Sequence, residues 1–168
     1  MWRCYCAVLS LTGAITPVAL IQVSHQLNVA RAKFQELTDA FDFVSSGQPM
    51  ENEAYLSKET GAVYWHSEYS EDIEELPNDI DDGEKYLLIP HKNDLGLGKP
   101  LALRFAEEFL SGDLEKVREI FGRRGAYARF KDLLENRGLL DRWHDFEAAA
   151  QKQALLDWCK ENRVEIDG

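Results

Sequence analysis

The residues with the most distinctive chemical pattern are basic side chains concentrated in one short stretch of an acidic chain. The 168-residue sequence has a formal net charge of −11, yet residues 117–143 carry more basic than acidic side chains. These basic residues are Arg118, Arg123, Arg124, Arg129, Lys131, Arg137 and Arg142. Guanidinium forks, together with free backbone amides at a helix start, bind phosphates and carboxylates. The sequence therefore predicts a binding surface at Arg123, Arg124, Arg129 and Lys131.

Two interpretations of this basic stretch stay open at the level of sequence. Charge runs usually lie on solvated helix faces, so the arginines could simply pair with acidic side chains of the N-terminal half. If they form a binding surface, the net charge of −11 repels nucleic acid and anionic membranes at long range. An acidic segment of another protein is then the favoured partner. Nucleic acid is the alternative, with residues 117–143 forming a helix-turn-helix-like pair.

Aromatic residues alternate with these basic side chains, and nucleic-acid bases can stack on such rings in single-strand binders. The aromatic residues are Phe121, Tyr127, Phe130 and Trp143. Their spacing matches a buried helical stripe, because apolar residues three or four apart share one face of a helix. We therefore expect these four rings to lie in the core.

The four histidines provide the only candidate for acid–base catalysis. His66 and His91 lie at the ends of the second and third expected strands, so they would approach each other if those strands were neighbours, with Glu68 or Asp94 nearby. A small hydrolase or transferase is therefore a second alternative function. No activated nucleophile accompanies the histidines. We assign no catalytic residue, and a non-enzymatic protein-binding or regulatory module is the preferred interpretation.

Other segments lack the spacing that a cofactor or a metal ion requires. Residues 96–100 contain Gly and Lys but not the phosphate-binding loop pattern, and the acids between 71 and 82 do not follow the calcium-loop pattern. Cys4 and Cys6 have no second pair to complete a tetrahedral metal site. Cys159 is expected to be a small buried hydrophobic residue. No cofactor and no metal ion are predicted.

The first 26 residues form a doubtful extension. No charged residue occurs between Cys4 and Val23, which resembles a signal peptide or a short anchor, but polar residues and Pro17 interrupt the apolar run. A mis-assigned translation start or a tail is the other interpretation. We expect one domain from residue 27 to residue 168. Cysteine usage favours the cytoplasm, and export or membrane anchoring is the alternative if the extension is a true signal.

Periodicity predicts an α+β fold with an N-terminal helix, a small antiparallel sheet of about three strands and a C-terminal cluster of three to four helices. Apolar spacing places the first helix at 34–44, ended by Ser46 and Gly47. Residues 54–57 and 62–66 form a hairpin whose turn contains Gly61, and 86–89 form a third strand. Helices follow at about 101–110, 114–121, 127–134 and 143–158. Asp113 is the expected N-cap of the second of these.

Two stretches of the chain resemble the bacterial uncharacterised protein family 0158. They are residues 121–132, with the sequence FGRRGAYARFKD and the downstream residues Trp143, Phe146 and Trp158, and residues 55–61, with the sequence YLSKETG. The resemblance spans about residues 27–165 and does not include the first 26 residues. It implies a domain that starts near residue 27. The family has no established activity, so the resemblance implies no function.

Overall fold

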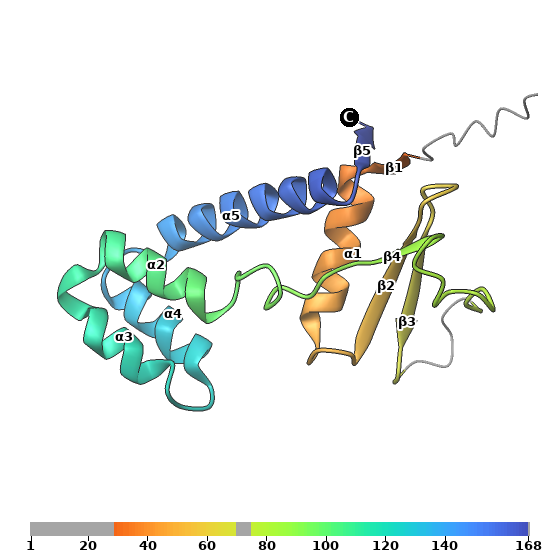
Figure 1. The fold of residues 1–168 in the computed structure, drawn as a ribbon. Coiled ribbons are helices and arrows are strands. Elements are labelled where there is room, and N and C mark those ends of the chain that lie inside the picture. The colour runs from red at the N-terminus through yellow and green to blue at the C-terminus, as the bar shows by residue number, and fades with distance from the viewer. Residues whose placement is uncertain (1–28, 70–74, 168) are drawn as a thin grey trace, which may run out of the picture.

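The computed structural model describes residues 29–69 and 75–167, and it shows an α+β fold (Figure 1). An N-terminal helix and a three-stranded antiparallel sheet are followed by a cluster of four helices, and a small parallel strand pair joins the two ends of the described chain. The predicted fold class is confirmed. The predictions for residues 1–26, including Cys4 and Cys6, lie outside the described residues.

Helix α1 (Phe34–Ser46) forms from the predicted apolar stripe. Leu37, Ala40, Phe41 and Val44 are at most 5% exposed, because residues three and four apart line the face that packs on the sheet. The helix ends at Ser46 as expected. The predicted reason was wrong, however, because Gly47 has φ −100° and is extended rather than left-handed.

The antiparallel sheet contains β2 (Asn52–Ser57), β3 (Val63–Ser67) and β4 (Tyr86–Leu88) in the order β3-β2-β4. Gly61 adopts φ +74° in the hairpin turn, as its position predicted. A Cβ atom at Gly61 would also lie 1.8 Å from the carbonyl oxygen of Arg31. The hairpin turn therefore packs directly against the backbone of the first strand.

The sequence did not predict a parallel pair between β1 (Ala30–Lys33) and β5 (Val164–Asp167). Each strand alternates buried and exposed residues, and Ala30 is paired with Val164. Figure 1 shows this pair beside the end of the last helix. The described chain thus begins and ends in one small sheet.

The C-terminal helices are α2 (Lys99–Phe109), α3 (Leu114–Ile120), α4 (Ala126–Asn136) and α5 (Leu140–Glu161), with a 3₁₀ turn η1 (Ser111–Asp113) between the first two. Pro100 lies in the first turn of α2, where its missing N–H costs nothing. Gly138 has φ +66° just after α4. All four predicted helices are confirmed.

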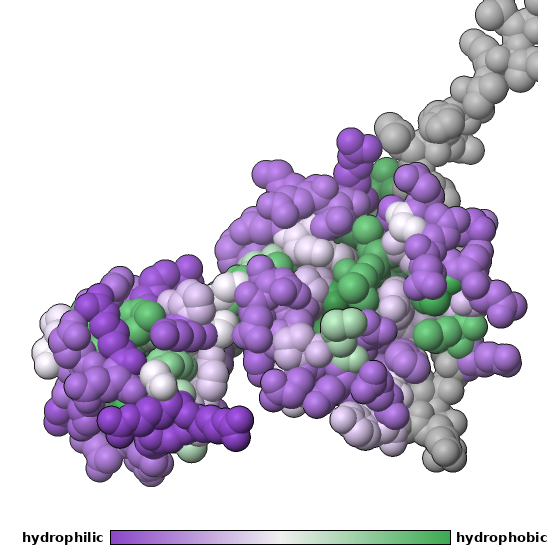
Figure 2. All heavy atoms as spheres, turned by 60° about the horizontal axis from the view of Figure 1, so that its bottom comes forward, coloured by the Kyte–Doolittle hydropathy of each residue, from purple (hydrophilic) through white to green (hydrophobic). Residues whose placement is uncertain are grey.

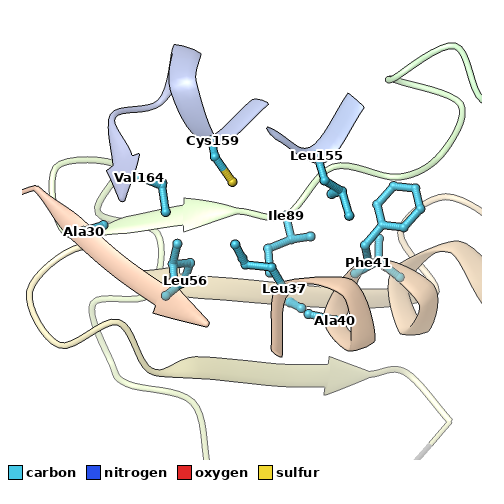
Figure 3. Close-up of a cluster of buried hydrophobic side chains, with 12 residues drawn as sticks. Ala30, Leu37, Ala40, Phe41, Leu56, Ile89, Leu155, Cys159 and Val164 are labelled. Carbon is cyan, nitrogen blue, oxygen red and sulfur yellow. The ribbon is translucent and has the colours of Figure 1, made fainter. Parts of the chain in front are cut away.

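Two separate groups of buried side chains stabilise the fold. The sheet core lies between α1, the sheets and the second half of α5, where Leu37, Leu56, Ile89 and Leu155 point toward one another (Figure 3). The helical core lies among α2, α3, α4 and the first half of α5, around Phe105, Phe130 and Trp143. We call the two regions the sheet lobe and the helical lobe. Figure 2 shows the molecule narrowing between them.

Within the described residues, no helix is long and apolar enough to cross a membrane.

Candidate functional site

The predicted binding residues lie at the turn between α3 and α4 and on α4 itself. Residues 121–125 form this turn, and Gly125, the residue just before α4, has φ +69°, a conformation that other residues rarely adopt. The Arg129 guanidinium reaches back and donates a hydrogen bond to the carbonyl oxygen of Arg124. Arg123, Arg124, Arg129 and Lys131 are all exposed.

The geometry of α4 places two of the predicted binding residues, Arg129 and Lys131, on different faces of the helix. Successive residues of an α-helix are about 100° apart around its axis, so Arg129 and Lys131 point in different directions. Asp132, Leu133 and Asn136 follow Arg129 at spacings of three, four and seven and share its face. The predicted surface therefore centres on Arg129 and the turn at Arg123 and Arg124, with Lys131 on another face of the helix.

An open groove of about 420 Å³ lies beside Arg129, between α3 and α4. Its cationic lining residues are Lys116, Arg129 and Arg137, its acidic lining residue is Asp132, and its apolar lining residues are Ile120 and Leu133. Figure 2 shows strongly hydrophilic side chains along one side of the helical lobe. We call Lys116, Arg123, Arg124 and Arg129, together with this groove, the basic surface.

Lys116 is a member of the basic surface that the sequence reasoning missed. It lies just before the segment that is net basic, so a count by segment left it out. Its spacing of four from Ile120 was a usable signal, because residues i and i+4 share a helix face. Both side chains line the groove.

Three other basic residues have partners within the helical lobe. Arg118 lies 2.7 Å from Glu115 and 3.9 Å from Glu107, and Arg137 binds Asp113. Arg142 lies over the ring of Phe109, with its guanidinium carbon 4.2 Å from the ring centroid. The predicted pairing was with acids of the N-terminal half, whereas the acidic partners of Arg118 and Arg137 lie in the C-terminal half, in α2, η1 and α3.

The residues at the turn differ from these paired arginines. In the part of the chain that the structure describes, no ion pair involves Arg123, Arg124, Arg129 or Lys131. The first turn of α4 also contains no acidic residue, so its positive dipole end adds to the positive charge of the turn. Arg123, Arg124 and Arg129 thus keep their guanidinium groups free of ion pairs in the described structure, although Asp132 lies on the same face of α4 as Arg129. Free guanidinium groups favour binding of carboxylates or phosphates.

The expectation that four aromatic rings lie in the core is correct for two of them and partly correct for a third. Phe130 and Trp143 are fully buried, with ring centroids 5.1 Å apart, and Phe121 is half-buried. Tyr127 is 38% exposed and packs edge-on against Phe121 at 5.2 Å. Partial burial raises the pKa of the Tyr127 hydroxyl above its usual range. Tyr127 is therefore an aromatic residue at the border of the surface.

The two strand-end histidines do not meet the condition under which we expected them to approach each other. Strand β2 lies between β3 and β4, and His66 is paired with Glu53 of β2. Neighbouring strands are about 4.8 Å apart, so β3 and β4 are separated by roughly twice that distance. Asp94 accepts a hydrogen bond from the backbone N–H of His91 at 3.1 Å. Strand neighbourhood thus gives no support to a catalytic pair of His66 and His91.

His91 is nevertheless unusual because it is only 6% exposed. Its Nδ1 accepts a hydrogen bond from the backbone N–H of Asn93 at 3.1 Å, so the proton of the neutral ring lies on Nε2. The Nε2 atom is buried and has no hydrogen-bond partner among the described residues. A buried donor without a partner costs about 1–3 kcal/mol.

The remaining candidate segments show structural roles. Lys85 lies 2.6 Å from Asp79 and 3.8 Å from Asp82 within the acidic loop, and the hydrogen bond from Lys85 lowers the pKa of Asp79. Glu71, Asp72 and Glu74 lie outside the described residues. Within residues 29–69 and 75–167, no three His, Cys, Asp or Glu side chains are grouped as metal ligands. Cys159 is 2% exposed and belongs to the sheet core, as predicted.

Comparison of the chain with protein-family models, curated proteins and solved structures finds no match. The resemblance to the bacterial uncharacterised protein family 0158 therefore stays a prediction from the residues.

Proposed function

We propose that this protein is a non-enzymatic binding module that takes an acidic segment of a partner protein on its basic surface. The observation that carries this proposal is the groove between α3 and α4, which Lys116 and Arg129 line together with the apolar residues Ile120 and Leu133. Arg123 and Arg124 extend the positive charge across the adjacent turn. In the described part of the chain, no acidic side chain forms an ion pair with Arg123, Arg124 or Arg129.

The mixed lining of the groove favours a partner segment with both acidic and apolar residues. Amphipathic helices bind grooves of this kind by inserting apolar side chains three or four residues apart. Carboxylates on such a helix would reach Lys116 and Arg129, and Arg guanidinium forks bind carboxylates with two parallel hydrogen bonds. The net charge of −11 on the whole chain makes this positive region local, so binding is directed to one face.

Nucleic acid is the alternative partner, and one observation favours it. Helices α3 and α4 are joined by the short turn 121–125, with Arg123 and Arg124 just before the second helix. That is the connectivity expected of a helix-turn-helix pair. The two partners differ in salt response, because phosphate binding weakens steeply as counterions are released.

A charge-reversal experiment tests the proposed function. The tagged full-length chain, the Arg123→Glu/Arg124→Glu variant and the Arg129→Glu variant are each used to capture partners from native extract, and bound protein and nucleic acid are both measured. We expect an acidic protein that is captured by the parent chain and lost with both variants. Loss of bound nucleic acid with a steep salt dependence would instead assign the surface to the alternative partner.

The matched control is Lys152→Glu/Lys160→Glu. These two lysines are exposed on α5, so the control makes the same change in net charge at a distance from the groove. The control is expected to capture the same acidic protein as the parent. Identical capture by the parent and by both arginine variants would overturn the proposal and make the basic stretch structural.

A further inference from the structure

A second groove lies in the sheet lobe, at the end of β4 and beside the turn between α1 and β2. Its volume is about 250 Å³, and its apolar lining residues are Val44, Pro49, Met50, Leu88, Ile89 and Pro90. Met50 and Leu88 are 75% and 54% exposed. Met50 also has φ +75°, a strained conformation for a residue with a side chain. Exposed apolar residues gathered at one groove indicate a contact surface.

His91 lines the same groove and carries the unused hydrogen-bond donor described above. Because Nδ1 is occupied by the Asn93 N–H, the ring presents Nε2 as a donor and not as an acceptor. A ligand that satisfies this atom must therefore bring an acceptor oxygen. A peptide carbonyl is such an acceptor.

The backbone of β4 offers further unpaired groups at Leu88, which also lines the groove. Ile89 donates its N–H to the carbonyl oxygen of Ala54 at 2.8 Å, and Lys58 donates to Lys85 at 2.8 Å. Hydrogen-bonded positions alternate along an antiparallel pair, so the N–H and C=O of Leu88 point away from β2. In the described part of the chain no strand pairs with that edge of β4. A free strand edge is a template for adding an extended peptide.

The charge and the volume of the groove limit the kind of ligand that can bind there. The charged carboxylates that line the groove are Glu53 and Asp94, so the groove attracts a basic segment and repels an acidic one. The volume of about 250 Å³ lies below the roughly 300–1,000 Å³ of sites for drug-sized ligands, and it suits one or two side chains. A second copy of this chain would bring the same carboxylates together.

We propose that an extended apolar segment of a partner protein, flanked by Lys or Arg, adds as a strand to the free edge of β4. One of its apolar side chains fills the groove, and its binding exposes Nε2 of His91, which is buried in the free protein, to one of its carbonyl oxygens as hydrogen-bond acceptor. This surface lies in the sheet lobe, whereas the basic surface lies in the helical lobe. The two interactions are therefore independent of each other.

Peptide titration of the ¹⁵N-labelled full-length chain tests this proposal by nuclear magnetic resonance. The probe is acetyl-Lys-Lys-Val-Thr-Val-Thr-Val-amide. Saturable shifts are expected at the amides of Met50 and Leu88 and at Nε2 of His91. A probe with Glu in place of both Lys residues should bind at least about fivefold more weakly, because its charges are repelled. A third probe keeps both Lys residues but has a Gly-Ser core, and it should give no saturable shift.

Two substitutions of Leu88 distinguish the contribution of its backbone N–H to peptide binding from the contribution of its side chain. Leu88→Pro removes only the N–H that points away from β2, and proline is tolerated on a strand edge in that orientation. Leu88→Ala keeps the N–H. We expect Leu88→Pro to abolish binding of the apolar probe and Leu88→Ala to weaken it a few fold, with unchanged amide shifts in β2 confirming that both variants fold. Arg123→Glu should leave the affinity unchanged.

Three results would overturn the proposal. The first is equal binding of the Gly-Ser probe, which would show unspecific attraction to an acidic protein. The second is full binding by Leu88→Pro. The third is a self-associated parent chain that Leu88→Pro makes monomeric, which would assign the β4 edge to a second copy of this chain.

Discussion

Arg137 and Asp113 form a two-point ion pair that ties the end of α4 to the start of α3. Nε of Arg137 lies 2.7 Å from one carboxylate oxygen of Asp113, and a terminal nitrogen lies 2.9 Å from the other. We expected Asp113 to cap α3 from its sequence position, but its side chain makes no capping hydrogen bond. A fork of two parallel hydrogen bonds fixes the geometry of both groups better than a single bond. This pair also orients Arg137, which lines the groove of the basic surface.

The pair should make stability depend on pH. The hydrogen bond from Arg137, and secondarily its charge, hold the pKa of Asp113 below the ordinary value of 3.8. A carboxylate with a lowered pKa stabilises the fold above its ordinary pKa, and this contribution is lost as the pH falls through the lowered value. We therefore expect Asp113→Asn to lower the urea midpoint at neutral pH, and the difference from the parent to disappear well below pH 3.8.

Glu115→Gln is the control for this pH prediction. Glu115 also lies 2.7 Å from an arginine, Arg118. However, the side chain of Glu115 is 81% exposed, and the two residues are only three positions apart in the sequence. Exposed pairs of this type contribute little. The urea midpoint of Glu115→Gln should stay near that of the parent at both pH values. A loss as large as that of Asp113→Asn would contradict the special role of the two-point pair.

Gly61 is predicted to be much less replaceable than Gly96. Both have positive φ, +74° and +67°, which costs a residue with a side chain about 1–2 kcal/mol. At Gly61 an added Cβ would also lie 1.8 Å from the Arg31 carbonyl oxygen, whereas nothing lies within 4 Å of one at Gly96. Gly61→Ala should therefore lose clearly more stability than Gly96→Ala in urea denaturation. Equal losses would show that the hairpin turn does not press on β1.

Local sequence patterns predicted most of the fold, because the apolar spacing or the turn residues that identify each element lie within a few residues of one another. The stripe of α1 and the turn at Gly61 are examples. The pairing of Ala30 with Val164 was missed, although both strands alternate apolar and polar residues, because periodicity within a strand does not identify a partner far away in sequence. At Gly47, in contrast, the local pattern predicted a left-handed conformation that the structure does not have. The turn after α1 takes its positive φ at Met50 instead.

The basic surface could be predicted only as a set of residue types. Sequence grouped Arg129 with Lys131 because they are close in the chain, yet helical geometry turns them apart. Lys116 and Arg129 come from different helices, and only their packing places them at one groove. Tyr127 satisfied a core spacing but lies at the rim of the helical lobe, because the stripe on α4 is centred on Phe130 and Leu134.

The thiol of Cys159 should react slowly in the folded protein. Burial raises its pKa from 9.0 to about 11, because the thiolate is poorly stabilised in the sheet core. Two pKa units lower the thiolate fraction on the order of 100-fold at mildly alkaline pH. Alkylation by iodoacetamide, followed by mass spectrometry of the peptide containing Cys159, should be slow in buffer and fast in denaturant. Equal rates in both would contradict burial of this residue.

The two lobes should unfold together, in keeping with the prediction of one domain from residue 27 to 168. Helix α5 places Trp143 in the helical core and Leu155 in the sheet core, and Leu97 packs against both. Loss of one core therefore removes packing from a helix on which the other depends. Phe105→Ala, which should cost about 3–5 kcal/mol, is expected to reduce hydrogen-exchange protection at Leu134 and at Leu56 alike.

Leu37→Ala provides the reciprocal test from the sheet core, where the expected cost is about 2–5 kcal/mol. If the two lobes unfold cooperatively, Leu37→Ala also lowers hydrogen-exchange protection in both lobes. The amides of both lobes then exchange through unfolding of the whole chain. If each variant lowered protection only in its own lobe, α5 would be transmitting no stability between them. The chain would then consist of two folding units that share a helix, and the prediction of a single domain would be wrong.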